Sequence, residues 1–326
     1  MYCGLITLLK LVKRFLRKSQ ITSIDINTES EDLTLIGGVR VGDAFPVRIM
    51  GIINVSPESF YNESVKTSAQ SISETASNMQ DSGADIIDIG AMSTAPYLET
   101  IVSTEEEIRR MRYGIEVVKN SCELPISADT PRSEVAKEAI RSGADAINDV
   151  TGLKYDRNMA NIVADSGLPV IICAHSRSRR NNKDSHRFPS HRLGRISATI
   201  KLLKESLVIA EKAKVSEDKI IIDPSIGFFR MEGKGPFFTK MEDLPWYIRD
   251  IEVISKLEEL KIFSKPICVS VSRKSFIGHL FGLKAKERLI PSIISEVISV
   301  INGANLIRTH NIQESLEALT MTELLH

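Results

Sequence analysis

The sequence predicts an α/β fold, a (β/α)8 TIM barrel, and two observations support this. From residue 47 onward, short apolar segments rich in β-branched residues alternate with longer segments of helical periodicity, eight times in all. Short, nearly continuous apolar runs are typical of parallel strands that are buried on both faces. Alternating strands and helices indicate a parallel sheet, and eight such units are the number that closes a barrel.

The expected elements follow one another without a low-complexity linker. The strands are predicted at 47–54, 85–90, 124–129, 145–150, 169–175, 219–224, 266–272 and 305–310. The helices share an apolar stripe at a spacing of three and four residues, and they are predicted at 67–83, 104–120, 132–143, 157–167, 193–214, 243–261, 274–302 and 311–325. Ser103 and Thr104, followed by Glu105 to Glu107, are typical of a helix N-terminus.

The chain ahead of the first strand, residues 1–46, is predicted to be an N-terminal appendage, and residues 47–326 to be the barrel domain. Two short β-like runs around Gly37 and Gly38 predict a hairpin that closes the N-terminal end of the barrel. Residues 5–18 have apolar side chains at helical spacing and basic side chains on the opposite face, so we expect an amphipathic helix. This helix could dock on the barrel, on the second copy in a homodimer or, less favourably, on a membrane surface.

The charge balance excludes one class of partner. The 42 Lys and Arg residues are matched by 42 Asp and Glu residues, so the formal net charge is zero and the pI is near 7.0. Domains that bind nucleic acids are usually strongly basic, so we expect no nucleic-acid partner. The apolar run near the N-terminus is short and is interrupted by Lys10, so we expect no membrane span. Four scattered cysteines form no disulfide scaffold or zinc motif, which indicates a cytoplasmic protein.

All eight predicted strands end in polar or charged residues. In a TIM barrel the carboxyl ends of the strands and the loops after them form the active site. At a single position, a polar residue is equally well explained by capping of the backbone, and we expect His175 and Asp88 to be structural. The complete set nevertheless favours an active site, and it consists of Asn54, Asp88, Asp129, Asn148, His175, Asp223, Arg273 with Lys274, and Arg308 with His310.

The types of these residues suit a planar heterocycle that carries a phosphate. Asp129 and Asp223 can accept hydrogen bonds from ring N–H groups, and the Asn148 amide can both donate and accept. The oxygens of Asn54 and of the loop after it could hold Mg²⁺ on the phosphate, because Mg²⁺ prefers oxygen ligands. Positive charge suited to phosphate comes from Lys274, Arg308 and His310.

Seven motifs follow one another along the barrel: MGIINVSPESF (50–60), GADIIDIGAMSTAP (83–96), SADTPRSEV (127–135), GADAINDVTG (143–152), IIDPSIGF (221–228), SRKSFIG (272–278) and IRTHN (307–311). In sequence and in order, this set resembles the motifs of the dihydropteroate synthase family of pterin-binding enzymes. The first two motifs look more like the archaeal branch of the family than the bacterial branch. The resemblance covers residues 47 to 320 and implies a TIM barrel, in agreement with the strand count.

The resemblance implies a transferase that joins 6-hydroxymethyl-7,8-dihydropterin pyrophosphate to an arylamine and releases pyrophosphate. Its substrates are therefore expected to be small molecules, with Mg²⁺ as the cofactor. The residues implied for the pterin are Asp129, Asn148, Asp223 and Lys274. Those implied for the pyrophosphate are Asn54, which also contacts the metal, Arg308 and His310. The expected catalytic residues are Lys274, Arg308 and His310. The acceptor and the loop over it are assigned to Phe60, Ser93, Thr94, Pro96, Phe228 and Ser275.

Two departures from the family pattern concern the acceptor. Ala95 stands where the family has the arginine of its STRP motif, so the loop over the acceptor lacks a charge. The segment 175–195 is rich in basic residues, which indicates either a solvated loop or an anion site. As an anion site, it would bind a distal phosphate through Arg177, Arg179 and Arg180. Together these features favour 4-(β-D-ribofuranosyl)aminobenzene 5-phosphate, the acceptor in methanopterin synthesis, over p-aminobenzoate, the acceptor in folate synthesis.

Two other functional classes stay open at this stage. A pterin-binding methyltransferase domain would use a similar barrel to present methyl-tetrahydropterin to a corrinoid protein. Asn54, Arg308 and His310 argue against it, because they serve a pyrophosphate that methyl-pterin lacks. A non-catalytic pterin-binding homologue is the other alternative, and the Ala95 departure keeps it open.

Overall fold

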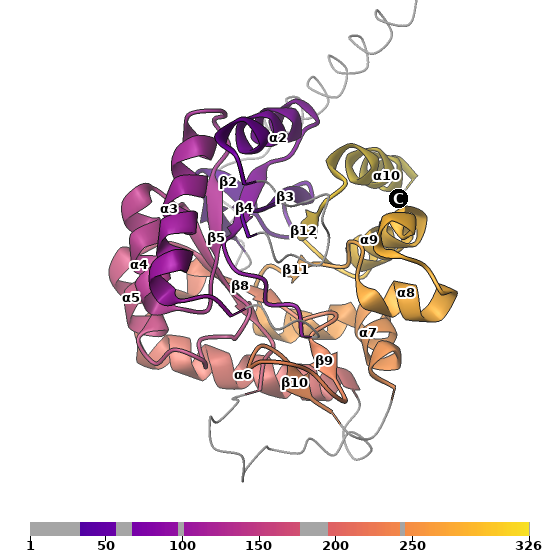
Figure 1. Ribbon diagram of the computed structural model, residues 1–326. Helices are drawn as coiled ribbons and strands as arrows, with labels where there is room; N and C mark the ends of the chain where they lie inside the picture. The colour runs from indigo at the N-terminus through magenta and orange to yellow at the C-terminus, as the bar shows by residue number, and fades with distance from the viewer. Residues whose placement is uncertain (1–32, 57–66, 97–100, 177–194, 242–244, 326) are drawn as a thin grey trace, which may run out of the picture. The chain divides into compact units, whose positions relative to one another are not determined.

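The computed structural model describes residues 33–56, 67–96, 101–176, 195–241 and 245–325. Its main sheet consists of β3 (Arg48–Asn54), β4 (Ile86–Gly90), β5 (Ile126–Asp129), β6 (Ala146–Asp149), β7 (Val170–Cys173), β8 (Ile220–Asp223), β11 (Cys268–Val269) and β12 (Leu306–Thr309). The strands are parallel and pair in the order β11-β12-β3-β4-β5-β6-β7-β8. The two ends of this order are β8 and β11. A bridge between Ile222 and Ile267 joins them, so the sheet closes into the barrel seen in Figure 1. The predicted fold class is confirmed.

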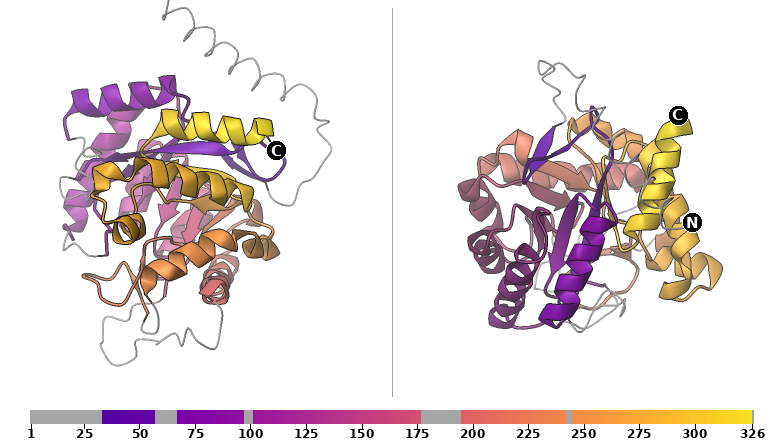
Figure 2. Two further views of the ribbon diagram at one scale, coloured as in Figure 1. Left: turned by 90° about the vertical axis from the view of Figure 1, so that its right-hand side faces the viewer. Right: turned by 90° about the horizontal axis from the view of Figure 1, so that it is seen from above.

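Helices surround the strands on the outside of the barrel (Figures 1 and 2). They are α2 (Ala69–Asp81), α3 (Thr104–Lys119), α4 (Ser133–Ser142), α5 (Met159–Ser166), α6 (Arg195–Lys212), α7 (Trp246–Ser255), α8 (Ser275–Phe281), α9 (Leu289–Ile301) and α10 (Ile312–Leu325). At the start of α3, the Ser103 side chain accepts a hydrogen bond from the backbone N–H of Glu106 at 3.2 Å, as its pattern predicted. Within the described residues, none of the helices combines the length and the apolar character needed to cross a membrane. The predicted helix at 5–18 lies outside the described residues.

Two predicted elements differ from the structure near the end of the chain. The single helix expected at 274–302 is wrong, because the segment forms two helices, α8 and α9. The first ends at Gly282, where a φ of +67° breaks the helical path, and a short 3-10 turn over Ala285–Glu287 precedes the second. The strand expected at 266–272 is only two residues long, because the chain turns where the backbone N–H of Lys274 donates to the carbonyl of Val271 at 3.2 Å.

Alternation along the strands divides the barrel into two cores. Successive strand residues point to opposite faces of the sheet. Ile49 and Ile87 therefore pack in the core between strands and helices, whereas Met50 and Ile86 pack with Ile221 inside the barrel. Two or four residues further along the strands, the inward-facing positions carry polar side chains. These side chains lie above the apolar cluster, near the carboxyl ends of the strands.

The predicted hairpin is present and closes the N-terminal end of the barrel. It consists of β1 (Thr34–Ile36) and β2 (Val39–Val41), which pair antiparallel. Ile36 and Val41 are fully buried and join the apolar cluster inside the barrel. Gly37 has a φ of +52°, and a Cβ there would lie 2.4 Å from Cβ of Pro125, so glycine permits this close approach. The hairpin belongs to the compact unit Asp32–His326, and a separate appendage over 1–46 stays a prediction.

One turn sequence, Gly-Ala followed by Asp or Asn, precedes three of the strands. Its glycine has a left-handed backbone each time, with φ of +94° at Gly83, +96° at Gly143 and +99° at Gly303. The third residue accepts a hydrogen bond from a backbone N–H at the start of a neighbouring strand, and the pairs are Asp85 with Ile49, Asp145 with Ile126, and Asn305 with Ile267. These caps fix the register at the closed end of the barrel and so set which residues reach the open end.

Replacing Asp145 by Ala should lower the free energy of unfolding by about 1–3 kcal/mol, because the buried N–H of Ile126 loses its acceptor. Urea denaturation followed by circular dichroism measures the change. Asp165→Ala is the control, since Asp165 is exposed, and it should change stability by about 0.5 kcal/mol or less. An Asp145 variant as stable as this control would contradict the capping role.

Candidate active site

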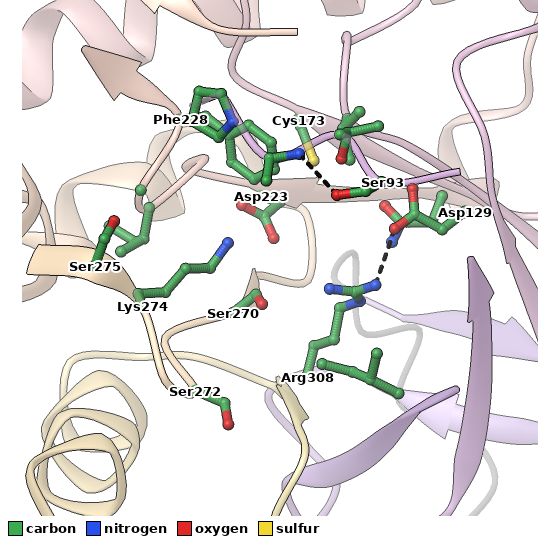
Figure 3. Close-up of a pocket in the computed structure, with 18 of the residues that line it drawn as sticks. Ser93, Asp129, Cys173, Asp223, Phe228, Ser270, Ser272, Lys274, Ser275 and Arg308 are labelled. Atoms are coloured by element: carbon green, nitrogen blue, oxygen red, sulfur yellow. Dashed lines mark hydrogen bonds and ion pairs between the residues drawn. The ribbon is translucent and has the colours of Figure 1, made fainter. Parts of the chain in front are cut away.

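A cavity opens at the carboxyl ends of the barrel strands, with a volume of about 890 Å³ that includes its open mouth. Every strand of the barrel, or the loop after it, contributes to its wall. Figure 3 shows most of the lining side chains. The predicted residues that line it are Asn54, Ser93, Thr94, Pro96, Asp129, Asn148, Asp223, Phe228, Lys274, Ser275, Arg308 and His310. Asp88, His175 and Arg273 of the predicted set do not line it. Four further predicted residues lie outside the described part of the chain, and they are Phe60, Arg177, Arg179 and Arg180.

Arg308 joins two carboxylates inside the barrel. Its Nε donates to Oδ2 of Asp88 at 2.6 Å, and its Nη2 donates to Oδ2 of Asp129 at 2.9 Å. Asp88 has no exposed surface and also accepts a hydrogen bond from Nδ2 of Asn148 at 3.2 Å. Asp88 therefore lies behind the cavity wall, as expected of a structural acceptor, and it fixes the orientation of both Arg308 and Asn148.

Asp223 is held by the turn that follows it. Its Oδ1 accepts a hydrogen bond from the backbone N–H of Ser225 at 2.6 Å. Ser225 and Gly227 have positive φ values of +59° and +86°, so the chain reverses tightly and returns Phe228 to the cavity wall. A Cβ on Gly227 would lie 2.9 Å from Cδ of Lys274. The glycine therefore leaves room for the lysine side chain.

Lys274 enters the cavity after a strained turn. Arg273 has a φ of +58°, a conformation that costs free energy for any residue with a side chain. The Arg273 guanidinium donates to Oδ1 of Asn311 at 3.0 Å and to the carbonyl of Lys286 at 2.7 Å, and it does not line the cavity. Nζ of Lys274 lies 4.5 Å from the centre of the Phe228 ring, and Figure 3 shows the amine directed toward Asp223.

His310 is neutral in this environment. Its Nδ1 lies 3.1 Å from Oγ of Ser272, which also accepts a hydrogen bond from the His310 backbone N–H at 3.2 Å. Burial, with the nearby charges of Arg308 and Lys274, lowers the pKa of His310 to about 3. At neutral pH the ring can therefore offer an N–H donor, rather than the positive charge that the sequence suggested.

Burial also moves the pKa values of the charged groups toward neutrality. It raises the pKa of Asp223, and it raises the pKa of Asp129 to about 7, where Arg308 opposes the shift and Asp88 adds to it. Burial and the charge of Arg308 lower the pKa of Lys274 to about 8, against the attraction of Asp223. Shifted pKa values of this kind are concentrated at functional sites.

Four polar or thiol side chains of the wall were not predicted from the sequence: Cys173, Arg230, Ser270 and Ser272. Alternation could have found Cys173, which follows the inward-facing Ile171 by two residues. His175, the polar residue predicted at that strand, is buried and does not line the cavity, as expected of a core histidine.

Arg230 carried no sequence signal, because its position depends on an arm that follows β8. The arm consists of β9 (Phe229–Arg230) and β10 (Thr239–Lys240), which pair parallel to each other. The loop between them is tied to the segment over the cavity, since the backbone N–H of Lys234 donates to the carbonyl of Pro96 at 2.6 Å. Of this arm, Arg230 lines the cavity.

The cavity offers few donor atoms for a metal ion. Among the described residues, no group of three or more His, Cys, Asp or Glu side chains could hold a metal ion. Asn54 lines the cavity and provides one amide oxygen, while residues 57–60 of the predicted metal loop lie outside the described residues. This donor set fits Mg²⁺ that is held mainly by substrate phosphate oxygens and water, which is a common binding mode of this ion.

The chain matches the family described as "Pterin binding enzyme" over residues 50–310. It is 34% identical over 278 residues to the dihydropteroate synthase of Clostridium beijerinckii, a match that covers 85% of this chain and 93% of the relative. It is also 34% identical over 266 residues to the Bacillus subtilis dihydropteroate synthase, a match that covers 82% of this chain and 84% of the relative.

Solved structures agree with these sequence matches. A Coxiella burnetii dihydropteroate synthase in complex with pteroic acid has a TM-score of 0.73 and 32% identity, over 90% of this chain and 98% of that chain. The Xanthomonas albilineans dihydropteroate synthase with 4-aminobenzoic acid has a TM-score of 0.73 and 27% identity, over 90% of this chain and 97% of that chain. These relatives are bacterial, so they do not support the likeness to the archaeal branch. By motif order, fold and these matches, the chain belongs to the pterin-binding enzymes and, among them, to the dihydropteroate synthase family of transferases.

Proposed function

We propose that the cavity condenses 6-hydroxymethyl-7,8-dihydropterin pyrophosphate with an arylamine and releases pyrophosphate. The observation that carries this proposal is the placement of Asp129, Asn148 and Asp223 in one cavity with Lys274 and Arg308. Carboxylates and an amide match the N–H and C=O edge of a pterin, and the two cations match the charge of a leaving pyrophosphate. The relatives are named as synthases, which favours C–N bond formation over methyl transfer to a corrinoid protein.

The residues divide between the two ends of the pterin substrate. Asp129, Asn148 and Asp223 bind the ring, and Lys274 lies over its face beside Phe228. Arg308 and His310 donate hydrogen bonds to the pyrophosphate, next to Asn54, because β12 pairs with β3, which ends at Asn54. Because Asp88 and Asp129 hold Arg308 in place before the substrate binds, little reorganisation is needed at the moment of reaction.

The reaction exchanges one bond at the methylene carbon of the pterin. The arylamine nitrogen attacks this carbon, the C–O bond to pyrophosphate breaks, and its electron pair leaves with pyrophosphate while the amine loses a proton to solvent. Positive charge develops on the pterin near the carboxylates of Asp129 and Asp223, which stabilise it. The lone pair of an aniline is available near neutral pH, so the protein mainly positions the reactants and stabilises charge.

Mg²⁺ is part of the proposal. When bound, it would neutralise charge on the pyrophosphate oxygens and make pyrophosphate a better leaving group. Asn54 is the described residue that would contact it, through its amide oxygen. The arrangement supports a metal that arrives with the substrate, because the described residues offer few ligands of their own.

The acceptor has two candidates. A relative's structure contains 4-aminobenzoic acid, which supports p-aminobenzoate for this chain. Ala95 and the basic segment 175–195 support the phosphoribosyl-arylamine of methanopterin synthesis instead. The predicted phosphate contacts of Arg177, Arg179 and Arg180 remain a prediction. We place the reaction in the cytoplasm, because the cysteines at 122, 173 and 268 are free thiols.

Purified protein given the pterin pyrophosphate and p-aminobenzoate should release one pyrophosphate for each dihydropteroate formed, and excess chelator should abolish turnover. Parallel assays with the phosphoribosyl-arylamine identify the better acceptor from the ratio of kcat/KM values. Lys274→Ala is the control and should be nearly inactive. Pyrophosphate release without a coupled product, or no release with either arylamine, would contradict the proposed function.

The pH profile of kcat/KM for the pterin substrate should be bell-shaped. Activity rises through about pH 7, where Asp129 gains its charge, and falls above about pH 8, where Lys274 loses its proton. In Lys274→Met the residual activity should no longer fall at high pH. If the fall persists unchanged in this variant, it belongs to the substrate or to another group, and the assignment to Lys274 is wrong.

A further inference from the structure

A buried ion pair lies on the inner face of α7. Arg249 is 2% exposed and Asp250 is fully buried, and Nη1 of Arg249 lies 3.1 Å from Oδ1 of Asp250. Neither residue lines the cavity. The other buried residues of the helix, Val253 and Ile254, are apolar. Replacing a buried ion pair by apolar side chains is often neutral or stabilising, so stability alone does not explain this pair.

The pair matches the backbone of the turn that follows β8. Arg249 donates from Nη1 to the carbonyl of Ser225 at 3.1 Å and from Nη2 to the carbonyl of Pro224 at 2.6 Å. Oδ2 of Asp250 accepts a hydrogen bond from the backbone N–H of Gly227 at 3.1 Å. Because φ is positive at Ser225 and Gly227, the turn departs from regular structure, and its buried backbone groups need side-chain partners.

Arg249 is anchored on two further sides. Its Nη2 donates to Oγ1 of the buried Thr199 on α6 at 2.8 Å, and its Cζ lies 3.7 Å from the centre of the Phe229 ring. The guanidinium therefore joins α6 and α7 to the first residue of β9, the strand that Figure 1 shows beside α7. A planar fork of five N–H donors can make all these contacts at once, which a lysine ammonium cannot.

The turn held in this way carries two side chains of the cavity wall. Asp223 begins the turn and accepts the N–H of Ser225 at 2.6 Å, while the N–H of Phe228 at its end donates to the Ser225 carbonyl at 3.2 Å. Asp223 and Phe228 both line the cavity. Ser225 thus connects Arg249 with the carboxylate proposed for the pterin ring and with the aromatic ring beside Lys274.

We propose that Arg249 and Asp250 are positioning residues for pterin binding, which act through the turn 223–228 to hold Asp223 and Phe228 in the geometry that the ring requires. The inference rests on the proposed function, since the ring belongs to the substrate of that reaction. Neither residue touches the ligand, and each acts through backbone groups. An ion pair supplies both the donors and the acceptor that this turn needs, without adding net charge behind the cavity wall.

Titration calorimetry with 6-hydroxymethyl-7,8-dihydropterin pyrophosphate tests this directly. Arg249→Met and Asp250→Asn should each weaken the affinity about tenfold or more, because buried groups of the turn lose their partners and the turn shifts. Arg249→Lys keeps the charge beside Asp250 but not the fork, so its affinity should lie between those of the wild type and Arg249→Met. Val253→Ala is the control. It removes buried apolar contacts on the same helix, away from the turn, and should leave the affinity within about twofold of the wild-type value.

Steady-state kinetics separate positioning from a simple loss of folded protein. A variant that is only partly folded loses kcat in proportion and keeps the KM of the wild type, whereas a displaced turn raises KM for the pterin substrate. Arg249→Met and Asp250→Asn should raise this KM about tenfold, in parallel with their loss of affinity. Val253→Ala should lower kcat at most.

Wild-type affinity and KM in the folded Arg249→Met and Asp250→Asn variants would overturn the inference, and so would equal losses of affinity in Val253→Ala. If both of these variants fail to fold, Arg249→Lys decides the matter. A wild-type affinity in Arg249→Lys counts against the inference, and a partial loss with raised KM supports it. If the wild-type protein does not bind the pterin substrate at all, the proposed function itself is contradicted, and the inference falls with it.

Discussion

A buried arginine between two carboxylates organises the interior of this barrel. Arg308 contacts Asp88 and Asp129 at 2.6 and 2.9 Å, and Asp88 also binds Asn148. A buried charge without partners would be very unfavourable, so each of these groups requires the others. Asp88 is shared, so one carboxylate sets the orientations of Arg308, proposed for the pyrophosphate, and Asn148, proposed for the pterin. The proposed division of substrate binding depends on this arrangement.

The rest of the fold positions the side chains around that network. The hairpin residues Ile36 and Val41 fill the closed end of the barrel interior with apolar side chains, whereas the polar lining of the cavity lies at the open end. The strained backbone at Arg273 and the glycine at 227 bring Lys274 over Asp223. Strain of this kind persists only where the surroundings compensate for it, and here the hydrogen bonds of the Arg273 side chain do so.

The barrel and most of its site could be predicted because each depends on local sequence. Every strand carries its own apolar pattern, and Asp129, Asn148 and Asp223 lie at strand ends, where the fold dictates their position. The split of the predicted helix 274–302 was missed, although Gly282 lies at the break. Arg230 could not be predicted, because the pairing of β9 with β10 and the stacking on Trp246 place it. The neutral state of His310 could not be predicted either, since it results from burial near Arg308 and Lys274.

A double-mutant cycle on Asp88 and Arg308 tests the central claim most directly. The free energy of unfolding is measured for Asp88→Asn, Arg308→Met and the double variant. Each single change should cost about 3 kcal/mol, and the double should cost less than the sum by more than about 1 kcal/mol, because in the double variant neither Asp88 nor Arg308 is left without the other. The surface ion pair of Glu106 and Arg109, which is only partly buried, provides the reference cycle, with a coupling of about 0.5 kcal/mol. Additive effects of Asp88→Asn and Arg308→Met would contradict the account.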